Sequence, residues 1–296
     1  MKFAHAQATR IGGRAMNEDR VGFWQTPGAA LMAVADGLGG HLHGEIAAEM
    51  AVELFGAVFR REAQPRLADP VAFLARAMAA SHAAILREGQ RLDLPETPRT
   101  VIVACVVQDG HAWWMHVGDC RLYLIREGRI VTRTRDHTVV QRLIDEGRIR
   151  EEAIASHPDR NRLLQCLGGY LAPTPGAAER MRLAKGDVLL LCSDGFWGPL
   201  TQRQMLHALL ARSLEEAIPE LAELAEHRGG PLSDNISVLA MTWGEEEVEP
   251  SGPPAEVTVV QDFTATDLDF MRMSDEDIEK AIDEIRAALR RNPPPQ

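Results

Sequence analysis

Short apolar runs along the chain predict the strands of a buried β-sheet. They are rich in branched and aromatic residues, and glycine or charged residues bound each run, which is the pattern of a strand inside a protein core. We expect strands at Leu31–Ala35, Arg99–Gln108, His111–Val117, Arg121–Ile125 and Val188–Cys192.

Longer stretches with apolar residues three or four positions apart predict helices with one buried face. Between two of them, Asp69 stands where an N-cap is expected and Pro70 suits the first helical position. The expected helices are Glu45–Phe59, Asp69–Gln90, Thr201–Ser213 and Leu214–His227. Because strands follow strands and helices come in pairs, without strict alternation, the pattern favours an α+β fold with antiparallel sheets covered by helices.

The chain changes character after Trp243. We expect one domain at 1–244, and then an acidic linker at 245–273 that contains proline and glycine. In the last segment, 274–291, four aliphatic residues recur with 4-3-4 spacing and predict an amphipathic helix. A helix of this length is marginal alone, so we expect it to dock on the domain or on a partner.

Composition narrows the class of protein. With 296 residues and 45% hydrophobic content the chain can bury a substantial core. The net charge of −11 is uneven, because residues 245–296 hold 14 acids and 5 bases, whereas residues 1–244 hold 29 acids and 27 bases. A nearly neutral body argues against nucleic-acid binding, which relies on basic surface.

Nothing in the sequence predicts a membrane location. The longest apolar run, Val101–Val107, is too short to cross a bilayer, and the first seven residues have no hydrophobic signal core. The cysteines have neither metal-ligand nor redox spacing, which suits a reducing compartment. We therefore expect a cytoplasmic protein with no membrane partner and with free thiols at Cys105, Cys120, Cys166 and Cys192.

Five separated aspartates carry the candidate chemistry. Each stands beside a glycine, an asparagine or a second acid, and most close an apolar run. Asp-Gly alone is more often a turn. Several carboxylates brought together, however, form an all-oxygen site for hard divalent cations. The five are Asp19, Asp36, Asp119, Asp194 and Asp234.

In this order, and with an arginine five residues before the first aspartate, the motifs resemble those of the metal-dependent type-2C protein phosphatases (PPM family) in their bacterial form. The resemblance extends from about Arg10 to Trp243. Seven segments carry it: Arg14–Asp19, Val34–Gly40, His116–Arg121, Thr134–Thr138, Asn161–Gly169, Leu191–Gly195 and Ser233–Val238.

The resemblance implies a four-layer αββα sandwich, with two antiparallel sheets flanked by helix pairs and the metal site at one end. It also implies a helix near 139–148 and a variable flap at about 149–171 that screens protein substrates. Arg160 and Arg162 in this flap would meet an acidic or phosphorylated substrate surface, or they are ordinary solvated charges.

By the same resemblance, two magnesium or manganese ions would occupy the site. Asp36 would bridge them, and the carbonyl of Gly37 would hold the second ion. Asp194 and Asp234 would hold the first. Such an ion pair lowers the pKa of a bound water and neutralises phosphoryl charge.

The remaining candidates would act around this pair. Glu18 and Asp19 would bind mostly metal-bound waters, and Asp119 would be a further metal ligand, shared with the Asp194 side. A third ion is possible. Read without the resemblance, Asp19 is a helix or turn cap. Arg14 would clamp two phosphoryl oxygens with its planar fork. The alternative for Arg14 is a surface ion pair with Glu18.

The implied activity is hydrolysis of phosphoserine and phosphothreonine in proteins, opposing a serine/threonine kinase. A catalytically weak, phosphatase-like binding module is the alternative. One departure stands out, since many members carry a histidine after Asp-Gly that is thought to protonate the leaving group, and here Leu38 stands there. His41 and His43 follow closely, but histidines beside a glycine turn are more often solvent-exposed.

A second enzyme class shares one spacing with this chain. Cys120 and Arg126 satisfy the Cys-x5-Arg pattern of thiol phosphatases. That chemistry needs a loop of small residues whose amides hold phosphate and lower the thiol pKa. The intervening residues are strand formers, and Asp119 would raise the thiol pKa. The pattern therefore argues against a thiol nucleophile.

Overall fold

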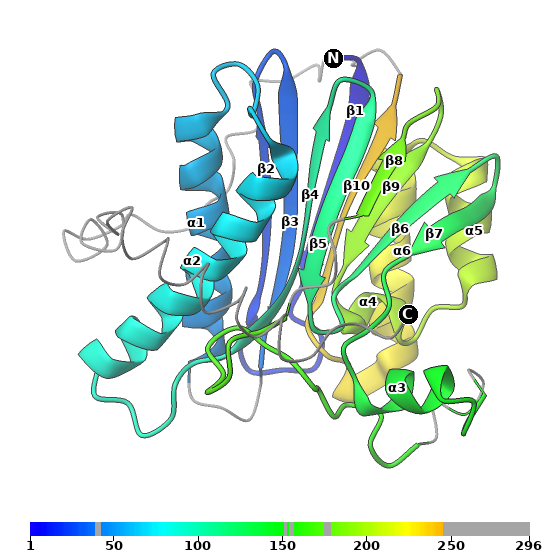
Figure 1. Ribbon diagram of the computed structural model, residues 1–296. Coiled ribbons are helices and arrows are strands. Elements are labelled where there is room, and N and C mark those ends of the chain that lie inside the picture. The colour runs from blue at the N-terminus through cyan, green and yellow to red at the C-terminus, as the bar shows by residue number, and fades with distance from the viewer. Residues whose placement is uncertain (39–42, 151–152, 154–156, 175–178, 245–296) are drawn as a thin grey trace.

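Two antiparallel sheets of five strands each stack face to face, and helices cover both outer faces (Figure 1). The computed structural model describes residues 1–38, 43–150, 153, 157–174 and 179–244. This arrangement confirms the expected α+β sandwich of four layers. The expected linker at 245–273 and helix at 274–291 lie outside the described residues.

The first sheet has the strand order β1-β10-β9-β6-β7, with every neighbouring pair antiparallel. Its first and last strands in the chain lie side by side, so the beginning of the domain is joined to its end. The strands are β1 (Phe3–Arg10), β6 (Arg121–Arg126), β7 (Arg129–Arg133), β9 (Val188–Cys192) and β10 (Ile236–Trp243).

The second sheet has the order β2-β3-β4-β5-β8, again antiparallel throughout. Its central strands are buried on both faces, which explains why they read as continuous apolar runs. On β3, for example, Leu31 and Ala33 pack under helices, whereas Met32 and Val34 pack against the first sheet. The strands are β2 (Asp19–Gln25), β3 (Ala29–Gly37), β4 (Thr100–Gln108), β5 (His111–Val117) and β8 (Glu179–Arg182).

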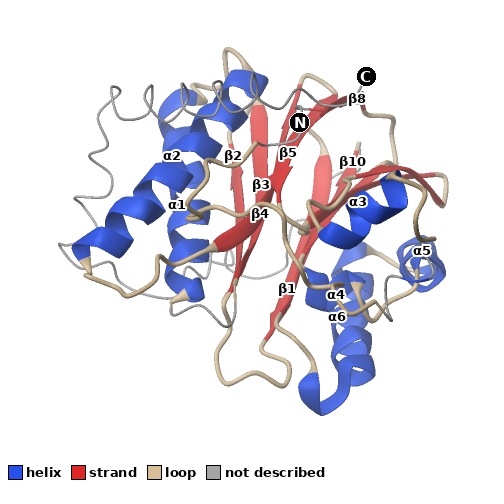
Figure 2. Ribbon diagram, turned by 60° about the horizontal axis from the view of Figure 1, so that its bottom comes forward, coloured by secondary structure: helices blue, strands red, loops and turns tan. Residues whose placement is uncertain are grey.

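Helices α1 and α2 cover the second sheet, and α4 and α6 pack on the first with α5 beside α6, whereas α3 lies at one end of the sandwich (Figures 1 and 2). A short 3-10 turn, η2 (Gly230–Leu232), precedes β10. The helices are α1 (Gly44–Glu62), α2 (Pro70–Arg91), α3 (Val139–Asp145), α4 (Asp194–Trp197), α5 (Gln202–Ala211) and α6 (Leu214–Gly229).

Local helix signals are confirmed. The Asp69 carboxylate accepts hydrogen bonds from the backbone N–H groups of Val71 and Ala72, and Pro70 is the first residue of α2. At the start of α5, Thr201 and Gln204 form a capping box. These contacts satisfy amide groups that a helix leaves without partners at its first turn.

Five strands lie outside those that we predicted. β7 and β8 are short edge strands rich in arginine, and β1 alternates between half-buried and exposed positions. β2 has one buried residue besides its first. β10 is buried except at its last residue, but its first residues belong to the closing motif. Edge strands need one apolar face at most, so their sequences carry a weak signal.

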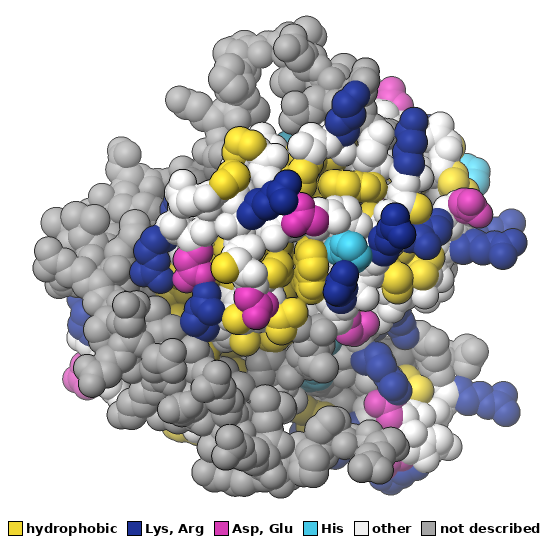
Figure 3. Space-filling model, turned by 45° about the horizontal axis from the view of Figure 1, so that its top comes forward, with side chains coloured by type: hydrophobic (Ala, Val, Ile, Leu, Met, Phe, Trp, Pro, Cys, Tyr) yellow, Lys and Arg dark blue, Asp and Glu magenta, His cyan; other side chains and the backbone are white. Residues whose placement is uncertain are grey.

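Helix α4, which begins at Asp194, lies in the lower part of the molecule in Figure 1, the end that Figure 2 turns forward. On the opposite end, Figure 3 shows Lys and Arg side chains interspersed with acidic ones. Among the described residues, no helix combines the length and apolar composition needed to cross a membrane.

Candidate metal centre

Antiparallel pairing brings the first two acids of the site together. Asp36 lies near the end of β3 and Asp19 begins β2, and the register of the two strands places these residues directly opposite each other. Asp19 is therefore a strand residue, and its interpretation as a helix or turn cap is wrong. Seventeen positions separate the pair in sequence, so the hairpin and not local spacing unites them.

A second strand pair supplies two more acids. Asp194 follows β9, and Asp234 lies just before β10, its antiparallel neighbour. Gly195 permits this approach, because a Cβ atom there would lie 2.0 Å from the carbonyl oxygen of Asn235. Any larger residue would push the two loops apart.

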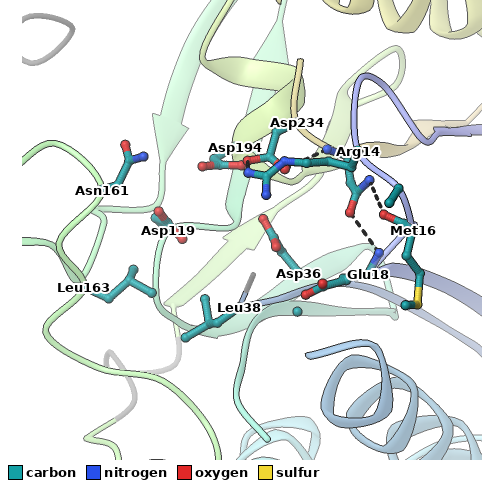
Figure 4. A pocket seen from close by; sticks show the side chains of 13 residues that line it. Arg14, Met16, Glu18, Asp36, Leu38, Asp119, Asn161, Leu163, Asp194 and Asp234 are labelled. Atoms are coloured by element: carbon teal, nitrogen blue, oxygen red, sulfur yellow. Dashed lines mark hydrogen bonds and ion pairs between the residues drawn. The ribbon is translucent and has the colours of Figure 1, made fainter. Parts of the chain in front are cut away.

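These loops surround a cavity of about 380 Å³ at the end of the sandwich (Figure 4). Asp36 approaches it from the end of β3, Asp119 from the segment before β6 and Asp194 from the start of α4, and Arg14 lies beside Asp234. Seven of the eight predicted site residues line it: Arg14, Glu18, Asp36, Gly37, Asp119, Asp194 and Asp234.

The eighth, Asp19, lies behind this wall. It is 3% exposed, and its Oδ2 accepts a hydrogen bond of 2.7 Å from the Ser193 hydroxyl. Ser193 precedes Asp194, so Asp19 supports the turn that carries a lining acid. The water-mediated role that we expected for Asp19 stays a prediction.

The aspartates of the site are buried close to one another, which disfavours the charged form of their carboxyl groups. Burial raises the pKa of Asp19 to about 7 and that of Asp194 to about 6, with neighbouring acids adding to both shifts. Burial also raises the pKa of Asp36 well above its usual range, followed by repulsion from Asp19 and Asp194. Burial, followed by repulsion from Asp194 and Asp136, raises the pKa of Asp119 well above its usual range.

The donor set fits a hard cation. Three carboxylate oxygens, Glu18 Oε2, Asp19 Oδ1 and Asp194 Oδ1, are buried without a hydrogen-bond partner. Buried polar atoms in proteins nearly always have partners, so three orphaned oxygens at one place indicate a missing positive group. Among the described residues, no group of three or more Asp, Glu, His or Cys side chains is already placed to hold one metal ion.

Gly37 is required by close packing. A Cβ atom at this position would lie 2.5 Å from both the carbonyl carbon and the oxygen of Gly44, at the start of α1. The neighbouring carbonyl of Asp36 is held by the Thr100 hydroxyl at 2.7 Å. The turn after β3 is thus fixed between α1 and β4.

Arg14 forms an ion pair with Asp234 and not with Glu18, the partner in the surface ion pair that we considered from the sequence. Its Nη2 donates to Asp234 Oδ2 at 2.7 Å, and no ion pair with Glu18 is found among the described residues. The guanidinium is about half exposed at the cavity. Its other N–H groups are available to an anion entering there.

Asn235 is a site residue to which we assigned no role from sequence. Its Nδ2 donates to the carbonyls of Ile11 and Met16, and its Oδ1 accepts from the Glu18 N–H at 2.8 Å. These three bonds hold the loop that carries Arg14. The signal in the sequence that could have identified Asn235 is its position next to Asp234 in the closing motif.

Asn161 and Leu163 also line the cavity, as do Met16 and Leu38. The first two belong to the predicted flap, whose following part is anchored by paired hydrogen bonds between Leu167 and Thr100. Apolar side chains therefore form part of the wall around an acidic floor (Figure 4). The residue types at these four positions did not identify them as part of the site from the sequence.

No histidine among the described residues lines the cavity. Leu38 occupies the position after Asp-Gly. His43 forms the N-cap of α1 in a left-handed conformation and approaches Glu45 at 3.4 Å. His41 lies outside the described residues. A histidine acid in this wall is therefore not supported by the described part of the chain.

The thiol alternative is contradicted by geometry. Cys120 is 1% exposed, and burial followed by Asp36 and Asp119 raises the pKa of its thiol. Residues 121–126 form β6, and Arg126 at its far end is bound to Asp187. An extended strand of this length separates the thiol from the guanidinium by more than about 15 Å.

Comparisons with known proteins agree with this site. A family model described as protein phosphatase 2C matches residues 6–227. The serine/threonine protein phosphatase PstP of Mycobacterium tuberculosis (strain CDC 1551 / Oshkosh) is 37% identical over 228 residues, which are 76% of this chain and 42% of that protein. A putative protein phosphatase 2C-type protein of Streptococcus pyogenes serotype M6 is 32% identical over 238 residues, covering 80% and 95%.

A crystal structure of the PstP catalytic domain in complex with two manganese ions has a TM-score of 0.70 and 32% identity to this chain. The match covers 81% of this chain and 98% of that one. This chain thus spans less than half the length of the mycobacterial relative and nearly all of the streptococcal one.

Proposed function

The chain belongs to the protein phosphatase 2C family, and on that premise we propose that it hydrolyses phosphoserine and phosphothreonine in proteins. Its substrates would be phosphoproteins made by an opposing serine/threonine kinase. The free cysteines of the described residues suit a reducing compartment, and we propose the cytoplasm.

One observation carries the proposal, namely the orphaned buried carboxylate oxygens beside a cavity with an arginine at its wall. Asp36, the Gly37 carbonyl, Asp194 and Asp234 would hold two magnesium or manganese ions, and Asp119 a possible third. Glu18 and Asp19 would act through water. When bound, such ions supply Lewis-acid activation of water and neutralise phosphoryl charge.

The remaining residues position the substrate. Arg14 can take phosphoryl oxygens with the N–H groups that Asp234 does not use, as the guanidinium fork favours. Leu38 and Leu163 cover part of the wall with aliphatic surface and so restrict water around the phosphoryl group. No histidine among the described residues lines the cavity, so we assign none of them as the proton donor to the leaving alkoxide.

The catalytically weak binding module has no observation in its favour. All five motif aspartates and Arg14 lie at or directly behind one cavity. A module that only binds phosphoproteins would not need several mutually repelling carboxylates, whose burial without cations destabilises the fold.

Hydrolysis of an aryl phosphate tests the function. Activity should require manganese or magnesium, stop with a chelator and resist thiol alkylation. Asp36→Asn and Asp194→Asn should each remove nearly all turnover while circular dichroism stays unchanged, and Arg14→Ala should mainly raise KM. Chelator-resistant turnover that alkylation abolishes would return the assignment to Cys120. Full activity in Asp36→Asn would contradict the ligand set.

A further inference from the structure

His137 joins two loops that both contribute to the cavity wall. Its backbone N–H donates to the carbonyl of Gly118 at 2.8 Å, and its Nδ1 accepts from the Gly118 N–H at 3.2 Å. Its carbonyl accepts from the Leu164 N–H at 2.8 Å. Gly118 precedes Asp119 and Leu164 follows Leu163, so a single residue contacts the neighbours of two lining residues.

The ring of His137 has a defined tautomer. Because Nδ1 accepts from an amide, the proton of the neutral ring is on Nε2. The ring stacks on His116 with centroids 4.4 Å apart, and His116 Nε2 donates to the Arg135 carbonyl at 2.8 Å. Burial, followed by repulsion from His116, lowers the pKa of His137 to about 3, so the ring is neutral at neutral pH.

The backbone on both sides of His137 is anchored. Asp136 accepts two hydrogen bonds from the buried guanidinium of Arg121. Thr138 caps α3 by accepting from the Gln141 N–H at 3.2 Å. With both neighbours fixed, the imidazole presents its acceptor to the Asp119 turn from a rigid support.

The Asp119 turn needs such support. Gly118 has φ +98°, and a Cβ atom there would lie 2.1 Å from a Val101 methyl group, so the turn makes a close approach that only glycine allows. The carbonyl of Asp119 is held from the other side by the Trp197 indole N–H at 3.0 Å. The His137 imidazole thus holds the turn at Gly118, and the Trp197 indole holds it at the backbone of Asp119.

We propose that His137 is a positioning residue: its Nδ1 acceptor and backbone N–H hold the Asp119 turn, and its backbone carbonyl links this turn to the 161–164 wall. Its consequence for catalysis rests on the proposed phosphatase function. Its consequence for the turn itself does not, because the hydrogen bonds exist without substrate.

Two substitutions separate the acceptor from the bulk of the ring. His137→Asn places a carbonyl oxygen near the position of Nδ1, whereas His137→Gln carries the same amide one bond farther out. Positioning predicts that Asn preserves the turn and Gln loosens it. A role in packing alone predicts that the smaller Asn is the worse of the two.

Amide hydrogen exchange of the full, metal-free chain measures the turn directly. In His137→Gln the Gly118 amide should exchange about tenfold faster than in the wild type, as expected when one hydrogen bond is lost. In His137→Asn it should remain close to the wild-type rate. His111→Gln is the matched control, because that ring bonds a backbone carbonyl at the other end of β5.

Calorimetric titration with magnesium gives the second measurement. His137→Gln should weaken magnesium binding about 10- to 100-fold, as loss of outer-shell support commonly does, and Asn should restore most of the affinity. With aryl phosphate, the Gln variant should lose kcat more than KM. Amide exchange and magnesium titration do not depend on phosphatase activity. They therefore test the proposal even if the wild-type chain proves inactive as a phosphatase.

Equal behaviour of the Asn and Gln variants in exchange and in magnesium binding would overturn the proposal. So would faster Gly118 exchange with unchanged magnesium affinity. If His137→Gln does not fold, His137→Asn decides alone: retained protection at Gly118 and retained affinity support positioning, and loss of both contradicts it.

Discussion

Replacing Asp136 with asparagine tests how much the domain depends on a buried ion pair beside the site. Arg121 Nε and Nη2 donate to the two carboxylate oxygens of Asp136 at 2.8 and 2.6 Å, and both side chains are 6% exposed. Arg121 also donates to the Tyr123 hydroxyl, and its guanidinium lies 3.4 Å from the centre of the Trp197 ring.

The expected loss follows from this burial. Asparagine removes the negative charge and leaves the guanidinium buried without a counter-ion, which costs about 3–5 kcal/mol of folding free energy. In a domain of this size, 1 kcal/mol lowers the melting temperature by about 2–4 °C. Asp136→Asn should therefore melt roughly 6–20 °C below the wild type.

Urea denaturation and calorimetry of the metal-free protein measure the effect. Glu88→Gln is the control, because Glu88 pairs with Arg91 on the exposed side of α2, where the loss should stay below about 1 kcal/mol. The double replacement Arg121→Met with Asp136→Leu should recover much of the loss, since it removes both buried charges.

Two results would refute this reasoning. If Asp136→Asn lies within about 1 kcal/mol of the wild type, the pair behaves like a surface pair despite its burial. If the double variant is no more stable than the single one, the loss comes from packing or from the Tyr123 contact and not from a stranded charge.

Three further predictions concern the site and the tail. Because the pKa of Asp19 is raised to about 7 from 3.8, its protonation stabilises the metal-free fold below about pH 4, and this contribution is lost as the pH rises towards 7. In thermal melts, chelated wild type should therefore lose more stability than Asp19→Asn between about pH 4 and pH 7, and equal slopes would contradict the shift. Asn235→Ala should raise KM for aryl phosphate about tenfold, because the loop of Arg14 loses three hydrogen bonds, and an unchanged KM would remove this role. Truncation after Gly244 should leave aryl phosphatase activity and metal dependence unchanged. If only the turnover of a phosphoprotein becomes slower, the 274–291 segment recruits a partner. If the melting temperature and both activities fall together, the segment docks on its own domain.

The sequence by itself determined the helices and strands whose signals are carried by a few neighbouring residues. The boundary of α2 follows from Asp69 and Pro70, which act on the first helical turn alone. The central strands β3, β4 and β9 were predictable because both of their faces are buried, which requires uninterrupted apolar runs. The motif aspartates could be identified as candidates because each stands beside a glycine, an asparagine or a second acid in the sequence.

Tertiary structure decided which of these acids face one another and what holds them. The β2–β3 register places Asp19 opposite Asp36, yet the packing leaves Asp19 behind the cavity wall. The meeting of Arg14 with Asp234, 220 positions away, depends on the pairing of β1 with β10. Such long-range contacts are selected by the burial of both sheet faces over the whole domain. No single segment encodes them, and for that reason the supporting role of His137 emerged only from the fold.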